Sequence, residues 1–176
     1  MQPNNQQHQL VTDSQQQNLG SVPLLSNLSI NSNIEGYFQH YQNFLSGFKG
    51  NVDCRVIPSK KGGSSLTLTK AGAEKICQFF SLNYGLFLLP QTQIDFQQGI
   101  FYYAYECRLF HSGIVVGNGF GSCNSFESKY NSSKVYLPDV VNTIDKMAQK
   151  RAFISAVLFT TGGSRFFGPK LDDLNS

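Results

Sequence analysis

The sequence predicts an α+β domain in which a three-stranded antiparallel sheet packs on a long C-terminal helix, with further helices nearer the N-terminus. Three observations predict this fold: aromatic residues at helical intervals after residue 35, three consecutive strand-like segments between residues 84 and 119, and a helical pattern that ends at a pair of glycines. The chain has 176 residues, about the length of one domain. We place the domain at residues 36–170, between tails at 1–35 and 171–176.

The N-terminal segment is polar and almost uncharged. Its first 34 residues contain 13 Gln or Asn and a single charged side chain, Asp13. Such a composition buries too little apolar surface to offset the entropy lost on ordering, so we expect a disordered tail. Short apolar patches at residues 22–25 and 28–30 could dock on a partner protein, and an inert tail is the alternative.

Two helices are predicted before the sheet. Aromatic and apolar side chains recur at steps of three and four over residues 37–48, which is typical of an amphipathic helix. Weak alternation predicts a strand at residues 52–58, and Gly and Ser residues then indicate a turn at 59–65. A second helix is expected over residues 70–80, where Thr69 is a suitable N-cap.

Residues 84–96, 100–111 and 113–119 predict the three strands. In the middle strand, alternation directs an apolar set toward the core, and His111-Ser112-Gly113 indicates a tight hairpin turn. The glycine-rich run 116–122 has neither the spacing of a dinucleotide-binding motif nor the ending of a P-loop. We interpret it as the end of a strand, leading into a loop over 119–137, where another backbone approaches closely. The core-facing set of the middle strand is Phe101, Tyr103, Tyr105, Cys107 and Leu109.

The last helix is expected over residues 139–160 and carries most of the functional signal. Lys146 and Lys150 stand four residues apart on one side, whereas Arg151 falls within the apolar stripe. A buried guanidinium needs a carboxylate or a phosphate. An internal ion pair and a contact with a polyanion therefore both remain open for Arg151. The candidate internal partners are Glu106, Glu127 and Asp145, and the predicted apolar stripe is Val141, Ile144, Met147, Ala148, Ser155 and Leu158.

Basic residues are concentrated between residues 129 and 165, where the net charge is +4 against +3 for the whole chain. Tyrosines lie beside them and in the expected sheet. Basic side chains combined with aromatic faces are typical of proteins that bind single-stranded nucleic acid. The alternative is that the tyrosines belong to the core. The candidate nucleic-acid-binding residues are Lys129, Tyr130, Lys134, Lys146, Lys150, Arg151 and Arg165.

Catalytic and metal-binding patterns are absent from the sequence. The four cysteines form no C-x-x-C pair, and the three histidines have no ligand spacing. We therefore expect a binding protein with no enzymatic activity, cofactor or metal. A nuclease using Glu106 and Glu127 is an alternative. No apolar run approaches the length of a membrane span and no secretory signal is visible, so a cytoplasmic, nucleoid-associated protein is expected.

Three segments together resemble a known family. They are Tyr102-Tyr103-x-Tyr105-x-Cys107, the run from Gly119 to Tyr130 that includes Gly121-Ser122-Cys123-Asn124-Ser125, and the helical run from Asn142 to Ala152. Over about residues 66–167 the chain is similar to small single-strand annealing proteins of phages and mobile elements. These belong with the Erf-type annealers and the eukaryotic ring-forming annealing protein of double-strand-break repair.

This resemblance implies a core of antiparallel strands on a long helix, protomers joined into rings or arcs, and single-stranded DNA in a positive groove. Lys146, Lys150 and Arg151 match the basic helix, and Lys129 and Tyr130 match the loop that approaches it. The predicted function is single-stranded DNA binding and strand annealing in recombination or mobile-element maintenance, with DNA expected in preference to RNA and a homo-oligomer expected. A non-catalytic adaptor or structural subunit of a nucleoprotein assembly is the alternative.

Overall fold

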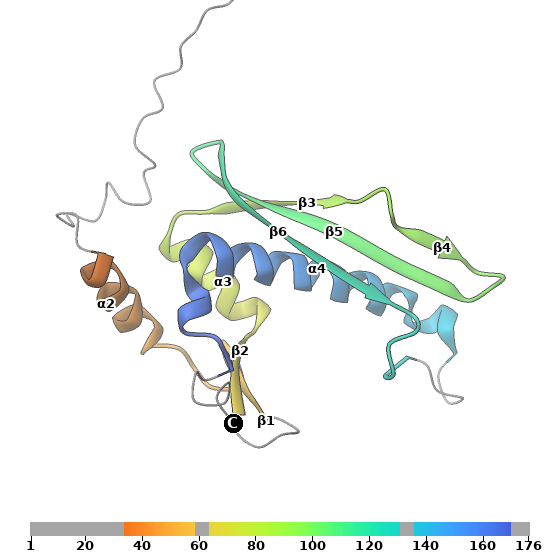
Figure 1. Cartoon of the computed structure of the whole chain (residues 1–176), viewed down its shortest axis with the longest axis horizontal. Coiled ribbons are helices and arrows are strands. Elements are labelled where there is room, and N and C mark those ends of the chain that lie inside the picture. The colour runs from red at the N-terminus through yellow and green to blue at the C-terminus, as the bar shows by residue number, and fades with distance from the viewer. Residues whose placement is uncertain (1–33, 59–63, 131–135, 170–176) are drawn as a thin grey trace, which may run out of the picture.

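The computed structural model describes residues 34–58, 64–130 and 136–169, and Figure 1 shows a long helix lying along one face of an antiparallel sheet. The predicted α+β class is confirmed. Of the two predicted tails, only the end of the first is described, where a helix already begins at Ile34. The elements are α2 (Ile34–Leu45), β1 (Cys54–Pro58), β2 (Ser64–Leu68), α3 (Lys70–Phe79), β3 (Asn83–Leu88), β4 (Gln93–Asp95), β5 (Ile100–His111), β6 (Ile114–Asn124), α4 (Leu137–Thr161), the short 3-10 helix η1 (Gly163–Arg165) and β7 (Gly168–Pro169).

Both predicted N-terminal helices are confirmed. α2 contributes Tyr41 to the core, and α3 begins after Thr69, whose hydroxyl accepts a hydrogen bond from the Gly72 backbone N–H at 3.2 Å. Thr69 is therefore the predicted N-cap. Asp53, fully buried, accepts a hydrogen bond from Lys75 Nζ at 2.6 Å, which ties the start of β1 to α3.

The larger sheet has four strands, so the prediction of three is wrong. β5 is central, β6 pairs along one edge, and β3 and β4 share the other edge. The single strand expected at residues 84–96 is interrupted around Pro90, because proline has no N–H to donate to the ladder. The hairpin between β5 and β6 is confirmed, with Ser112 and Gly113 both at positive φ, as a two-residue turn of this kind requires.

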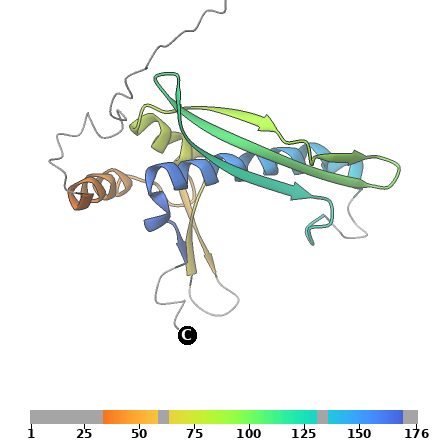
Figure 2. The same cartoon turned by 45° about the horizontal axis from the view of Figure 1, so that its top comes forward.

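β6 is longer than predicted, because residues 119–124, expected in a loop, continue the strand. A glycine stands at alternate positions of β6 where it crosses α4. A Cβ added at Gly119 would lie 2.1 Å from the backbone nitrogen of Ala156, and one at Gly121 equally close to that of Ala152. Figure 2 shows β6 passing over α4. The expected close approach to another backbone is confirmed, and it lies inside the strand.

α4 ends at Gly162, whose φ of 67° confirms the predicted glycine C-cap. The predicted apolar stripe is only partly correct. Because α4 packs on the sheet and also on α3, its buried face turns along the helix. Val141, Met147, Ser155 and Leu158 are only half-buried. Among the α4 residues whose burial the structure describes, the fully buried apolar ones are Ile144, Ala148, Ala152, Phe153, Ala156 and Val157.

A second, smaller sheet was not predicted. β1 and β2 form an antiparallel hairpin, and the two-residue β7 extends it. The hairpin points away from the larger sheet (Figure 1), and Val56 and Ile57 on β1 are exposed. Only β1 had been expected as a strand, since the Ser- and Gly-rich residues before β2 resemble a long turn.

Candidate nucleic-acid interface

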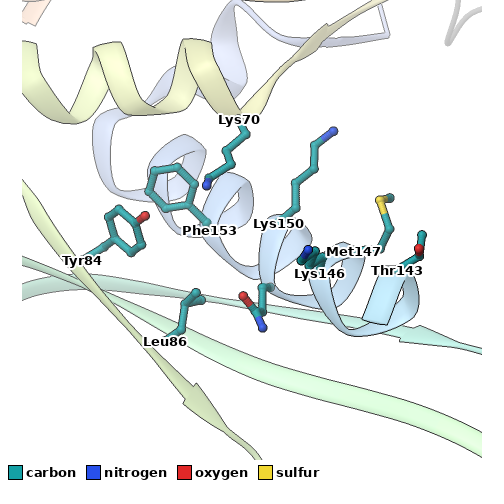
Figure 3. A pocket seen from close by; sticks show the side chains of 9 residues that line it. Lys70, Tyr84, Leu86, Thr143, Lys146, Met147, Lys150 and Phe153 are labelled. Atoms are coloured by element: carbon teal, nitrogen blue, oxygen red, sulfur yellow. The ribbon is translucent and has the colours of Figure 1, made fainter. Parts of the chain in front are cut away.

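A cleft of about 450 Å³ opens between α3, β3 and α4, and three lysines line it. Lys70 begins α3, whereas Lys146 and Lys150 stand about one turn apart on α4. Figure 3 shows the three side chains around this space, with Tyr84 of β3 across from α4. Tyr84 is 42% exposed, and the centroid of its ring is 4.4 Å from that of the Phe153 ring. The fold thus places three ammonium groups and an accessible aromatic face together.

Two of these three lysines are not neutralised within the described part of the chain. Lys146 and Lys150 form no hydrogen bond or ion pair with a described residue. Lys70 Nζ lies 3.4 Å from Glu74 Oε1, but both side chains are exposed, and water screens such a pair strongly. The cleft therefore carries a positive potential.

The carboxylate nearest to these lysines in the sequence faces the sheet. Asp145 accepts a hydrogen bond from the Tyr105 hydroxyl at 2.7 Å and from Gln149 Nε2 at 3.1 Å. Burial raises the pKa of Tyr105, and its hydrogen bond to Asp145 raises it further, so the phenol stays protonated as the donor. Because these bonds hold Asp145 on the sheet side of α4, Lys146 is left to the cleft.

Arg151 follows Lys150 directly, yet its guanidinium is neutralised. It donates to both carboxylate oxygens of Glu127, with 2.9 Å between Nη2 and Oε2, and to the Ser122 carbonyl at 2.6 Å. This bond to Arg151, together with one from the Cys123 thiol, lowers the pKa of Glu127 to about 2 against the opposing effect of burial. Arg151 therefore forms an internal ion pair, and Glu127 is its partner. The expected burial is wrong, since its side chain is 40% exposed.

The Glu127 carboxylate also lies near Lys129, a second candidate binding residue. Lys129 Nζ lies 3.4 Å from Glu127 Oε2 and 4.5 Å from the centroid of the Tyr130 ring. Tyr130 itself is only 6% exposed and belongs to the core beside α4, as the alternative interpretation of the tyrosines held. Lys134, a further candidate, lies outside the described residues.

The last candidate is remote from the cleft and has its own partners. Arg165 Nη2 lies 3.7 Å from Glu35 Oε1, and its guanidinium lies over the Phe38 ring at 4.7 Å. Of the predicted binding residues that the structure describes, only Lys146 and Lys150 line this cleft.

No model of a known protein family matches the chain, and no curated protein matches it. Within the described residues, no helix is both long enough and apolar enough to cross a bilayer. The 25-residue α4 has the length, but charged side chains such as Asp145, Lys146 and Lys150 interrupt it.

The two carboxylates of the nuclease hypothesis are both bonded to arginines. Glu106 accepts a hydrogen bond from Arg108 Nη2 at 2.7 Å and from Asn118 Nδ2 at 2.9 Å. Strand alternation turns Glu106 away from α4, whereas Glu127 lies against Arg151 on α4. No three His, Cys, Asp or Glu side chains of the described residues lie close enough together to hold a metal ion.

Lys70 and Tyr84 belong to the cleft but were not among the predicted binding residues. Sequence reasoning placed Lys70 in a helix and Tyr84 near the start of a strand, both correctly. Nothing in the sequence joins them to Lys146, because their proximity arises only when α3 and β3 pack against α4. The alternation pattern that puts Tyr84 on the inner face was the one available signal.

Proposed function

We propose that this protein binds single-stranded DNA in the cleft between α3, β3 and α4 and promotes annealing of complementary strands. The proposal is carried by the three lysines on the cleft, two of which have no carboxylate partner among the described residues. Each phosphate that an ammonium group neutralises releases condensed counterions, which favours binding. No covalent bond is made or broken in this function.

The aromatic wall of the cleft favours a single strand over a duplex. Tyr84 presents a partly exposed ring and Leu86 an apolar surface beside the lysines. Unpaired bases can stack on such a ring whatever their identity, whereas the bases of a duplex already stack on each other. Binding is therefore expected to depend little on sequence.

The resemblance to single-strand annealing proteins supports annealing in particular. Lys146 and Lys150 match the basic helix of that family, and the order of helix, antiparallel strands and long helix agrees with the implied core. Among the described residues, β6 has a neighbouring strand on one edge only. We infer that copies associate into a ring or arc, which would keep the strand extended with most bases free to pair.

Replacement of the two unneutralised lysines tests the proposal. The double variant Lys146→Ala, Lys150→Ala should bind a fluorescent oligothymidylate at least about tenfold more weakly at low salt, because two charge-assisted contacts are lost. With about three phosphate contacts, wild-type affinity should fall near 20-fold between 50 and 200 mM salt, and the variant should lose most of this dependence. Fluorescence anisotropy at several salt concentrations measures both.

The matched control removes the same charge elsewhere. Lys49→Ala with Arg55→Ala also deletes two exposed cations, but from outside the cleft, and should change affinity less than about twofold. Equal losses in the two double variants, or an affinity independent of salt, would contradict a site in this cleft. Strand annealing is followed separately, as the rate at which two complementary oligonucleotides form duplex.

One observation favours the adaptor function as the second candidate. Val56 and Ile57 are 65% and 48% exposed on the projecting β1–β2 hairpin, a surface that suits a protein partner. An adaptor would bind that partner and leave the annealing rate unchanged. Sedimentation with and without an oligonucleotide separates the two functions, because an annealing protein should form larger assemblies on the strand.

A further inference from the structure

A second hollow of about 450 Å³ continues the basic cleft along α4. Lys150 and Met147 line both spaces, so the two hollows adjoin at these residues. From there the second hollow follows α4 toward Phe159, with Thr67 and Leu68 of β2 on its other side. Phe159 stands nine residues beyond Lys150, about 14 Å along the helix axis and about half a turn around it, so the two residues lie at opposite edges of the second hollow. Arg151, whose charge Glu127 neutralises, and Ser155 also line the second hollow, and its other α4 residues beyond Lys150 are apolar. The two hollows together are called the groove, with the lysine cleft as its cationic half and the second hollow as its apolar half.

The apolar half ends at an aromatic ring that no described residue covers. Phe159 is 74% exposed, so most of its ring is open to solvent or to a ligand. Ile154 and Leu158 provide further apolar surface, and Thr67 and Ser164, which carry hydroxyls, also line the hollow. A flat, partly polar group that stacks on an aromatic ring and reaches a hydroxyl fits this combination.

We propose that the apolar half of the groove holds a nucleobase of the bound strand, stacked on Phe159. This inference rests on the proposed function, because the strand must first lie on Lys146 and Lys150. A base is the occupant for two reasons. The hollow shares Lys150 and Met147 with the cationic cleft, so a strand held on the lysines has its next bases near the hollow, and Lys150 can hold the intervening phosphate. Stacking on Phe159 tolerates any base.

Binding to an abasic strand, which has the phosphates but no bases, distinguishes base stacking from phosphate binding. Wild-type protein should bind oligothymidylate more tightly than an abasic strand of equal length and charge. Phe159→Ala should weaken oligothymidylate binding about 5- to 150-fold and leave abasic binding unchanged. Because Phe159 is mostly exposed, its truncation should not unfold the protein. Phe126→Ala, at a residue 65% exposed outside the groove, is the control and should change neither affinity.

A tryptophan reporter gives an independent readout, since the chain contains no Trp. Phe159→Trp should bind oligothymidylate at least as tightly as wild type, and its fluorescence should be quenched by that strand but not by the abasic one. Phe126→Trp should show no quenching by either strand.

The outcomes distinguish this inference from the function beneath it. Equal affinities of wild type and Phe159→Ala for oligothymidylate, with the lysine variant still impaired, would overturn base stacking and leave strand binding intact. A lysine variant with unchanged affinity overturns both. If Phe159→Ala instead alters only the mass of the free protein, Phe159 is a contact between copies of the chain and the inference is wrong.

Discussion

Adjacent positions of α4 differ in whether their positive charge is neutralised within the described part of the protein. Lys146 and Lys150 line a cleft and meet no carboxylate among the described residues, whereas both terminal nitrogens of Arg151 bond to Glu127. A step of one residue turns a side chain by about 100° around the helix, so neighbours in the sequence face different surroundings. The lysines are available to a ligand, and the arginine holds the loop after β6 against the helix.

The difference shows why a count of basic residues locates a binding site poorly. The +4 charge of residues 129–165 includes Arg151, Lys129 and Arg165, each within 4 Å of a carboxylate. A pair that is neutralised locally contributes little to the potential felt by a distant phosphate. Lys70, far away in the sequence, contributes to the cleft instead. We therefore expect the lysines to govern binding and Arg151 to govern stability, which variants can test.

The largest loss of stability should come from a variant that separates α4 from the sheet, because this disturbs the surroundings of both the lysines and Arg151. Gly119→Val would place side-chain atoms against the backbone of Ala156, where a Cβ alone would already lie within 2.1 Å. Backbone atoms cannot yield as a side chain can, so we expect a loss of about 3 kcal/mol or more in unfolding free energy. Urea denaturation followed by circular dichroism measures it.

A neighbouring residue on the opposite face of β6 provides the control. Phe120→Val also introduces valine, but Phe120 is 59% exposed, and the change should cost less than about 1 kcal/mol. Similar losses at both positions would mean that the glycines of β6 are not required for close packing on α4.

The next effect should separate stability from binding. Arg151→Ala leaves Glu127 without its bidentate partner, and we expect a loss of about 1–3 kcal/mol in unfolding free energy. The double variant Arg151→Ala, Glu127→Gln should recover part of this loss, because the unpaired charge is gone. Arg151 also lines the second hollow, but the pair with Glu127 carries no net charge, so strand affinity of the folded double variant should stay within about twofold of wild type. A tenfold loss of affinity without a loss of stability would make Arg151 a ligand contact instead.

Much of this fold could be predicted from local pattern. Thr69 as a cap, Gly162 as a terminator and the alternation that directs one face of β5 to the core are signals within a few residues. Each is confirmed, although Ala104 and Glu106 on the other face of β5 are buried as well. The division of the edge strand at Pro90 had a local signal that was not used. In contrast, the cleft depends on which face of α4 packs on α3, and the partner of Arg151 depends on where a loop returns. Both depend on tertiary packing. The prediction from sequence therefore left the partner of Arg151 open and did not include Lys70 in the site.

A smaller effect should appear in the pH dependence of stability. The pKa of Glu127 is lowered to about 2 from its ordinary value near 4.5, so the folded state gains from the carboxylate above about pH 4.5 and loses this gain as the pH falls toward 2. Because Arg151 is partly exposed and water screens the pair, we expect about 1–2 kcal/mol. Between pH 5 and 3, wild type should lose more unfolding free energy than Glu127→Gln. Parallel curves for the two proteins would contradict this.

The smallest effect on stability should come from replacing Arg165, an ion-paired cation that is more exposed than Arg151. Its guanidinium also meets a carboxylate, that of Glu35, but at 3.7 Å and with both side chains more than half exposed. An exposed pair of this kind contributes about 0–1 kcal/mol, and the contact with the Phe38 ring adds a similar amount at most. Arg165→Ala should therefore lower the melting temperature by only a few degrees and leave strand affinity within twofold of wild type. If it instead weakened binding as strongly as the loss of Lys146 and Lys150, the positive surface would extend beyond the cleft to the end of α4, and local pairing would not separate binding cations from structural ones.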